Sequence, residues 1–298
     1  MATDTATEVF EEHRPVLMGV AYRMLGRVAD AEDVVQDAWL RWSGADRSDV
    51  REPRGYLVRV TTRLAIDRLR HVQSRNEAYV GPWLPEPYVT HFGDAVPDTA
   101  ERAVLADSVS LAVLVVLESL SPLERAVFVL REAFGYPYAD IATTLDRSES
   151  AVRQLAGRAR RHVEEKRPRY EVDPAQRRDL TERFIAAATE GDLEGLMSLL
   201  APDVRLVGDS GGRAQAPLRV IESADKVGRF LHGAARKGAG KGAGEVSFRF
   251  LEVNGGAALL VLVEGKPDSV FQLDVADGRI QCVYIVRNPE KLLYLAVD

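Results

Sequence analysis

The length, composition and charge of this chain exclude several classes of protein. Its 298 residues are enough for two or three domains that each bury their own core. The longest apolar runs, 111–117 and 257–263, fall far short of the ~18 residues of a membrane-spanning helix, and the first residues lack a signal-peptide pattern. The single cysteine, Cys282, excludes an intramolecular disulfide and a cysteine-cluster metal site. We therefore expect a cytoplasmic protein with no membrane contact, no metal and no cofactor.

The distribution of charge matters more than its sum. A net charge of -6 is opposite to that of a protein that simply coats DNA. Positive charge is nevertheless concentrated in two segments, 54–75 and 147–169, of an otherwise acidic chain. Non-specific binding depends on neutralising DNA phosphates, and the acidic remainder of this chain opposes it. The affinity for arbitrary DNA should therefore be modest. The pattern favours a protein that needs a partner before it engages a promoter.

The N-terminal part predicts three helices. Apolar residues keep helical spacing over 8–25 and 29–42, and Gly26 is a suitable stop between them. After a polar loop at 43–53, Pro53 opens an arginine-rich helix that runs to about residue 75. The acidic residues of the second helix form either a solvated face or a partner-binding face. The arginines of the third either track phosphates or form a cationic solvated face.

The middle of the chain predicts a linker and then further helices. Residues 76–99 contain four prolines and several aromatic residues without periodicity, which indicates a linker that packs on another part of the chain. Helices resume at about 100–120. Ser121 and Glu124 then form a capping box around Pro122, which is a strong helix-start signal.

Residues 138–161 have the pattern of a helix-turn-helix. Apolar spacing breaks at 146–148 and resumes from Val152. The outward face of the second helix presents Ser150, Gln154, Gly157 and Arg161, flanked by Arg153 and Arg158. Such a hydrogen-bonding and cationic face is what a major-groove helix requires. Gly157 costs about 1 kcal/mol in helix propensity against alanine, and we hypothesise that its small size permits close approach to DNA.

The C-terminal part has a different architecture. Helices are predicted at 176–189, 192–201 and 223–235, and strands at 204–208, 246–253, 257–264, 270–275 and 281–286. The pairs Asn254-Gly255 and Asp277-Gly278 suit hairpin turns. This order predicts an α+β domain with a curved antiparallel sheet wrapped over helices.

Six motifs resemble one family. DAEDVVQDAWLRW at 30–42, YLVRVTTRLAIDRLR at 56–70 and LSPLERAVFVLREAFGYPYADIA at 120–142 resemble bacterial extracytoplasmic-function sigma factors. YVGPWLPEP at 79–87, DSGGR at 209–213 and NPEKL at 288–292 are similar to motifs of the sigma-J-like group, which has a fused SnoaL-like domain. Ser210 and Arg213 depart from that group's DGGGK pattern, so contacts that need glycine freedom or lysine geometry there are in question.

The resemblance implies a multidomain fold. Two all-α sigma domains, the second with a helix-turn-helix, would precede an α+β SnoaL-like, cone-shaped domain with a curved antiparallel sheet. The implied domains are sigma region 2 at 1–75, a linker at 76–107, sigma region 4 at 108–168 and the SnoaL-like domain at 173–298. The implied function is promoter-specific transcription initiation with core RNA polymerase. The last domain would act in cis as an intramolecular regulator and not as an enzyme.

The resemblance also assigns residues to each partner. The clamp helices of the largest polymerase subunit would contact Glu32, Asp33, Gln36 and Asp37. The minus-ten element of promoter DNA would contact Arg47 and Asp49, in a polar loop at 43–53 that has no aromatic residue and would admit an unstacked base. Arg59, Arg63 and Arg70, on the following helix, would track its phosphates. The minus-thirty-five element would contact Arg147, Ser150, Arg153, Gln154, Arg158 and Arg161. Arg153 and Arg158 would be the first candidates to read it, and Arg147, Arg160 and Arg161 would contact phosphates. Interdomain regulatory contacts would come from Trp83, Pro85, Asp209, Gly211, Gly212, Arg213, Asn288 and Lys291.

Two alternatives stay open. One is a helix-turn-helix regulator that binds operators without polymerase. The other is a SnoaL-type small-molecule enzyme or ligand sensor fused to the DNA-binding part. SnoaL-like enzymes use Asp, His or Tyr in an apolar cone, where this chain offers His232 and Asp209. We expect His232 to be structural and Asp209 to be a turn residue, and an unknown small ligand in the cone stays an alternative.

Overall fold

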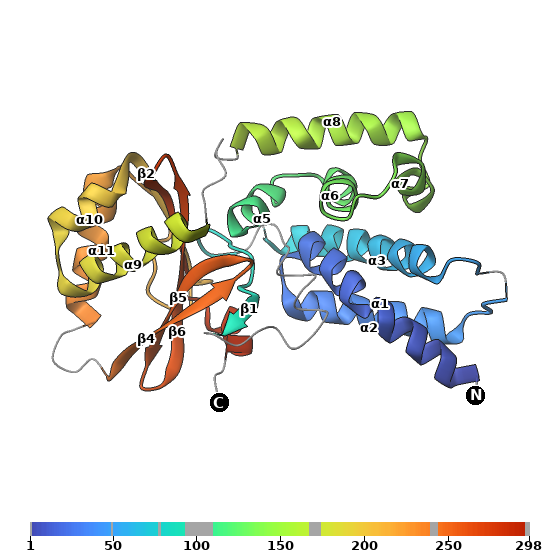
Figure 1. The fold of residues 1–298 in the computed structure, drawn as a ribbon, viewed down its shortest axis with the longest axis horizontal. Coiled ribbons are helices and arrows are strands. Elements are labelled where there is room, and N and C mark those ends of the chain that lie inside the picture. Colours follow the sequence, from blue (N-terminus) through green and yellow to red (C-terminus); the bar gives the residue numbers. More distant parts are fainter. Residues whose placement is uncertain are drawn as a thin grey trace. The chain divides into compact units, whose positions relative to one another are not determined.

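The protein folds into two compact units. The structure is a computed structural model that describes residues 2–48, 50–76, 79–92, 110–166, 174–238 and 244–295. One unit comprises Met1–Glu77 and Pro97–Arg167, and the other Ala78–Val96 and Pro168–Asp298 (Figure 1). The candidate residue Asp49 and the first part of the helix expected at 100–120, up to residue 109, lie outside the described residues.

Within the described ranges, no helix combines the length and apolar character needed to cross a membrane.

The first unit begins with three helices, α1 (Ala2–Leu25), α2 (Val28–Gly44) and α3 (Pro53–Asn76). They confirm the three helices expected from apolar spacing. Leu17 and Val34, at most 3% exposed, belong to their shared core. Gly26 follows α1 with φ of 68°, a left-handed conformation that glycine adopts without strain. Trp42 is buried and donates its indole N–H to the Ala6 carbonyl at 2.9 Å, which fixes α2 against α1.

The rest of the first unit contains α5 (Leu111–Leu117), α6 (Pro122–Phe128), the π-helical turn η1 (Val129–Ala133), α7 (Tyr138–Leu145) and α8 (Glu149–Lys166). Ser121 and Glu124 form both hydrogen bonds of the expected capping box. The helix-turn-helix is also confirmed, because Asp146 ends α7 in the left-handed region at φ 53° before α8 begins.

The second unit is built on a seven-stranded sheet of order β1-β4-β5-β6-β7-β2-β3. Its strands are β1 (Val89–Phe92), β2 (Leu200–Asp209), β3 (Ile221–Glu222), β4 (Val246–Val253), β5 (Gly256–Val263), β6 (Lys266–Ala276) and β7 (Arg279–Val286). Neighbours pair antiparallel except β2 and β7, which are parallel. Asn254-Gly255 and Asp277-Gly278 have positive φ throughout and form the expected hairpin turns.

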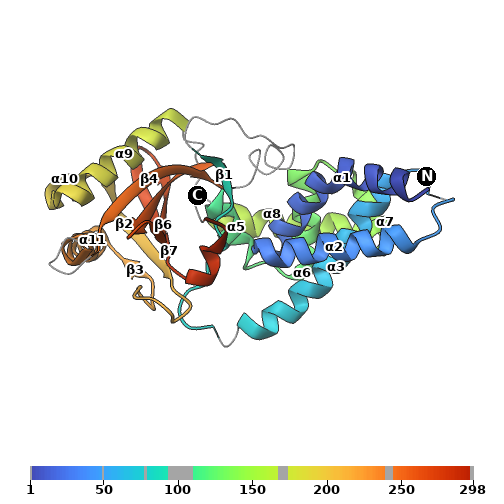
Figure 2. The same cartoon turned by 90° about the horizontal axis from the view of Figure 1, so that it is seen from below.

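Three helices cover one face of this curved sheet, namely α9 (Pro174–Glu190), α10 (Leu193–Leu199) and α11 (Ala224–Gly238), as Figures 1 and 2 show. Phe184, Leu196 and Val227 from the helices pack against Leu206 and Val283 from the strands. The α+β prediction is therefore confirmed. The described chain ends with the 3-10 turns η2 (Pro289–Lys291) and η3 (Leu293–Leu295).

Two strands differ from the sequence-based expectation. β1 lies inside the stretch expected to be a linker without a strand, and it pairs with β4 through His91↔Glu252 and Phe92↔Leu251. β3 was also not expected and pairs with β2. Both are very short edge strands, whose hydrogen bonds come from a distant partner and not from a local alternating pattern.

Candidate nucleic-acid interface and linker anchor

One face of α2 is acidic and exposed. The structure brings together on it all four predicted polymerase contacts: Glu32, Asp33, Gln36 and Asp37. Arg68 of α3 donates from Nη2 to Asp30 at 2.6 Å and to Asp33 at 3.1 Å. The hydrogen bond that Arg68 donates to Asp30 is the main cause that raises the pKa of Arg68. Asp33 is therefore ion-paired within the protein.

Leu40 extends this face and was missed by the sequence reasoning. It lies three residues after Asp37 and four after Gln36, so the three side chains share one side of the helix. Leu40 is 59% exposed, which is unusual for a large apolar side chain on a regular helix. The acidic face thus ends in an apolar contact point, and helical spacing from the acids would have identified it.

The loop after α2 contains the first predicted minus-ten residue. The Arg47 guanidinium lies 5.4 Å from the Trp42 ring centroid, and its Nη1 donates to the Trp42 carbonyl at 3.1 Å. Asp46 accepts the backbone N–H of Ser48 at 3.0 Å, and that bond lowers the pKa of Asp46. Because Trp42 is only 3% exposed, its ring supports Arg47 and offers little surface for stacking a base.

The predicted minus-ten arginines of α3 do not form one open strip. Arg63 is exposed, but its Nε donates to the Thr144 carbonyl at 2.8 Å and its Nη2 to the Thr143 carbonyl at 3.5 Å. These carbonyls belong to the last turn of α7, where a cation is favoured by the helix dipole. Arg70 pairs with Asp67 at 3.1 Å, whereas Arg59 is half-buried.

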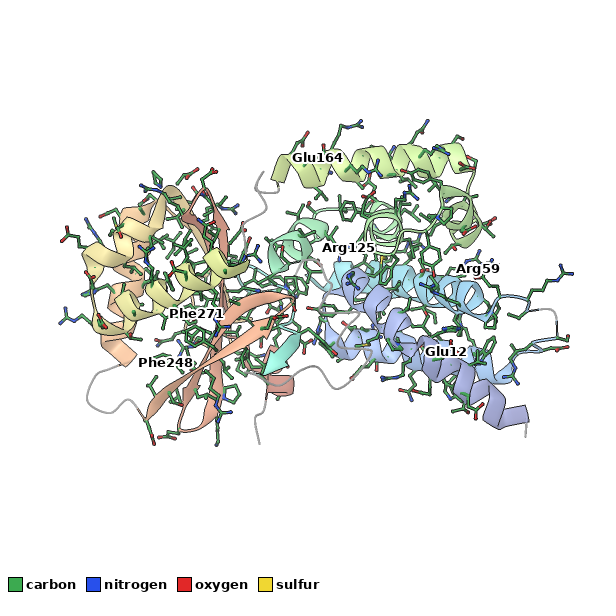
Figure 3. All side chains as sticks on the ribbon, viewed as in Figure 1. Glu12, Arg59, Arg125, Glu164, Phe248 and Phe271 are labelled. Carbon is green, nitrogen blue, oxygen red and sulfur yellow. The ribbon has the colours of Figure 1, made fainter. Side chains whose placement is uncertain are left out.

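A buried arginine, also missed by the sequence reasoning, connects α6 with α1. Arg125, labelled in Figure 3, is 0% exposed and donates from Nη1 to the Met24 carbonyl at 2.8 Å and to Glu118 at 2.7 Å. A buried cation is stabilised only by such partners, so Arg125 fixes α6 on the end of α1. Its role depends on a carbonyl 101 residues away, which no local pattern reveals.

Five of the predicted minus-thirty-five residues lie on the outer side of α8, and Arg147 lies in the turn between α7 and α8. All six are exposed: Arg147, Ser150, Arg153, Gln154, Arg158 and Arg161. Two of the arginines are already held by carboxylates. Arg153 donates twice to Glu149, at 3.1 and 2.5 Å, and lies 4.7 Å from the Tyr138 ring. Arg158 donates from Nε to Glu124 at 2.8 Å.

A buried ion pair binds the segment 79–92 to the sheet of the second unit. Asp209, at the end of β2, is 0% exposed and accepts from Lys291 Nζ at 2.6 Å. The same carboxylate accepts the Leu84 N–H at 2.7 Å, and Lys291 also donates to the Leu84 carbonyl. Both backbone groups of Leu84 are thus satisfied by one buried pair. Lys291 Nζ lies 4.0 Å from the ring centroid of half-buried Trp83.

A second set of hydrogen bonds surrounds this pair. The Tyr79 hydroxyl donates to Asp209 at 2.5 Å and accepts from Asn288 Nδ2 at 2.8 Å. Gly211, at φ 57°, donates its N–H to Asp209 at 3.2 Å, and a Cβ there would lie 2.6 Å from Asn288 Nδ2. We call the six residues Tyr79, Trp83, Leu84, Asp209, Asn288 and Lys291 the linker anchor.

The structure corrects the expectation that Asp209 is a turn residue. Although it accepts one bond from the following turn, it is buried and mainly binds Lys291 and the segment 79–92. Ser210 does not have positive φ, whereas Gly211 and Gly212 do, so the departure at 210 removes no required glycine. Arg213 lies outside the linker anchor and makes an exposed ion pair with Glu290 at 2.8 Å. Pro85, the remaining predicted contact, is buried.

Asp209 and His232 are not brought together as an acid–base pair in the cone. Side chains alternate along β2, and Val204 and Leu206 belong to the core under the helices, so Asp209 lies on the opposite face of the sheet. His232 is half-buried on α11, and a Cβ at Gly191, in the turn after α9, would lie 3.8 Å from its Cε1. This placement supports a structural role for His232.

Comparison with protein families identifies the class of the helical unit. Residues 9–75 match the model of sigma-70 region 2, and residues 110–163 match that of sigma-70 region 4. The two matched segments contain the acidic face of α2 and the helix-turn-helix, respectively. The chain is therefore a sigma-70-type factor. Such factors bind core RNA polymerase and promoter DNA.

Relatives specify the family. The chain is 40% identical over 288 residues, 95% of this chain and 91% of the relative, to the ECF RNA polymerase sigma factor SigJ of Mycobacterium tuberculosis. It is 36% identical over 299 residues, 97% of this chain and 95% of the relative, to the probable ECF sigma factor SigI of that species. The crystal structure of M. tuberculosis SigJ aligns with a TM-score of 0.77 at 36% identity, covering 96% of this chain and 98% of that one.

The chain belongs to the extracytoplasmic-function (ECF) RNA polymerase sigma factors and directs promoter-specific transcription initiation. Its second unit has the expected SnoaL-like α+β fold with a curved sheet. An operator-binding regulator that acts without polymerase is not favoured by these matches.

Proposed function

We propose that the parts of this sigma factor divide the work of initiation in the cytoplasm as follows. Region 2, at 1–75, binds the polymerase clamp helices through the acidic face of α2 together with Leu40, and contacts the minus-ten element through Arg47 and α3. Region 4, at 108–168, reads the minus-thirty-five element with the outer side of α8. The support is that the acidic residues and Leu40 of α2 and the polar residues of α8 are exposed on regular helices.

We further propose that the SnoaL-like domain, at 173–298, regulates initiation in cis through the linker at 76–107. The observation that carries this proposal is the linker anchor. The segment 79–92 lies in sequence between the two segments matched by sigma regions, yet its Leu84 backbone is bound by the buried Asp209–Lys291 pair. β1 adds strand pairing with β4 to the same attachment. Any change in the distance between regions 2 and 4 must involve the linker that joins them. Because the SnoaL-like domain binds this linker, it can influence that distance.

A non-catalytic role for the SnoaL-like domain is the better supported one. The carboxylate that the enzyme alternative would use, Asp209, is bound to Lys291 and lies on the sheet face opposite the helices. A general base needs to reach a substrate proton within hydrogen-bond distance, and a buried carboxylate that already accepts four donors does not meet that need.

Run-off transcription with core polymerase and genomic promoter fragments tests both statements. We expect the wild-type chain to direct initiation and Lys291→Met to change the amount of transcript or the affinity for polymerase. Arg213→Ala, which alters only an exposed ion pair, is the matched control. If the wild-type chain starts no transcript on any fragment, the promoter-reading assignment fails. If Lys291→Met releases the segment 79–92 and transcription stays at the wild-type level, regulation through the linker anchor is wrong.

A further inference from the structure

The arginines on the outer side of α8 are held in two different ways. Arg153 uses both Nε and Nη2 on Glu149, and Arg160 uses both Nε and Nη2 on Glu132, at 2.9 and 2.7 Å. These contacts occupy one edge of each guanidinium group. An arginine bound in this way keeps less of the planar donor pair that recognises an acceptor edge of DNA.

Arg158 differs because its contact with Glu124 uses Nε alone, at 2.8 Å. Within the described part of the chain, its two terminal nitrogens have no protein partner. The Arg158 side chain is 52% exposed, so the terminal nitrogens reach solvent while the Nε end is fixed. Such a side chain is oriented before it meets DNA, and less conformational entropy is lost when it binds.

Glu124 is itself held in place from two sides. Its Oε2 accepts from Ser121 Oγ at 2.7 Å and from the Ser121 N–H at 3.3 Å, and its Oε1 accepts from Arg158. The Glu124 side chain is only 14% exposed. Burial raises its pKa, but the hydrogen bonds from Arg158 and Ser121 outweigh burial and lower the pKa overall. Glu124 is therefore ionised at neutral pH and anchored to the N-terminus of α6.

We propose that Glu124 is a positioning residue for recognition of the minus-thirty-five element. It binds Nε of Arg158 so that the two terminal amino groups present a fixed donor pair to an acceptor pair in the major groove, such as O6 and N7 of guanine. The inference rests on the proposed function of α8 and deepens it, because it separates one oriented base-reading arginine from Arg153 and Arg160, which are left to contact the DNA backbone.

The test uses holoenzyme and a promoter library randomised over the minus-thirty-five element, with sequencing of the bound fraction. Glu124→Gln is the informative variant, because glutamine preserves the capping box with Ser121 but removes the charge that holds Arg158. We expect it to lower discrimination at one base-pair position by about tenfold, as one bidentate contact is lost. Arg158→Ala should lower discrimination at the same base-pair position. The double variant, with both Glu124→Gln and Arg158→Ala, should lose no more discrimination than Arg158→Ala alone.

Glu132→Gln is the matched control and should leave the base preference at every position unchanged. Glu124→Gln should keep the wild-type melting temperature and the wild-type affinity for core polymerase. Wild-type discrimination in Glu124→Gln, with discrimination lost in Arg158→Ala, would overturn the positioning role. Wild-type discrimination in Arg158→Ala would overturn base reading by that arginine. A wild-type holoenzyme that selects no minus-thirty-five sequence would instead refute the proposed function of α8.

Discussion

The linker anchor gives the sharpest stability prediction, because it combines a buried cation and a buried anion with unequal sets of partners. Asp209 accepts from Tyr79, Leu84, Gly211 and Lys291, whereas Lys291 donates to Asp209 and the Leu84 carbonyl. Removing one partner of a buried ion pair costs about 3–5 kcal/mol, mainly because the other charge is stranded. The partner left behind therefore decides the cost of each substitution.

Asp209→Ala should be the more damaging of two single substitutions. It leaves the Lys291 ammonium, 2% exposed, without its carboxylate counter-ion, so we expect the full cost of about 3–5 kcal/mol. Lys291→Met leaves the Asp209 carboxylate with three of its donors and keeps an apolar stem beside Trp83. Its cost should be closer to that of one charged hydrogen bond, about 1.5–3 kcal/mol.

Hydrogen exchange of the Leu84 amide, which donates to Asp209, measures the effect of both substitutions. We expect Asp209→Ala to accelerate exchange by a hundredfold or more, since each 1.4 kcal/mol is about tenfold. The double variant should cost less than the sum of the singles, because no charge is then stranded. Arg213→Ala should stay within about 1 kcal/mol of wild type, as expected for an exposed pair. Equal exchange rates in Asp209→Ala and Arg213→Ala would refute the reasoning.

Three further predictions concern other parts of the chain. Leu40→Ala should weaken binding to core polymerase without lowering the melting temperature, because Leu40 is 59% exposed, and unchanged affinity in a polymerase pull-down would exclude it from the interface. Gly157→Ala meets no atom within 4 Å of the new Cβ, so it should raise helix stability by about 1 kcal/mol while weakening promoter binding; binding at or above wild-type strength would refute close approach of DNA at this glycine. Burial raises the pKa of Cys282 to about 12, so the native thiol keeps a proton that the unfolded thiol loses above its ordinary value of 9.0. Stability should therefore fall as pH rises from about 9 towards about 12, by up to about 1.4 kcal/mol per pH unit, and a urea titration in which Cys282→Ala shows the same pH dependence as wild type would contradict this.

Local patterns were sufficient for much of the fold. The capping box at Ser121, the break at Asp146 and the hairpin turn at Asn254-Gly255 each depend on a few neighbouring residues, and each is confirmed. Apolar periodicity likewise predicted α1 to α3 and the helices over the sheet. These signals can be read from the sequence because neighbouring residues supply both the donor and the acceptor of each hydrogen bond, or all the residues of each apolar stripe.

Apart from Leu40, which helical spacing would have identified, the missed features depend on distant partners. Asp209 looked like a turn residue beside two glycines because its donors Leu84 and Lys291 are 125 and 82 residues away. The contact of Arg63 with Thr144 spans 81 residues, and β1 exists only through the edge of β4. A charged residue in a sequence gives no indication of whether it faces solvent, a helix end or a buried counter-ion. Candidate site residues could therefore be named from the sequence, but the contacts that they make could not.

The hydrogen bonds between Arg63 and the end of α7 set a limit on what the free protein can bind. The two promoter elements are centred about 25 base pairs apart, which is about 85 Å of duplex at 3.4 Å per base pair. In the first unit, α3 and α7 are instead joined by a bond of 2.8 Å. One copy in this conformation is expected to span at most one element. Its apparent affinity for a whole promoter is then reduced, because the apparent Kd equals the intrinsic Kd divided by the fraction of molecules in which the helices have separated. The weak DNA binding that we expect of the free protein would therefore follow from this geometry as well as from net charge, and polymerase would relieve it by stabilising the separated form.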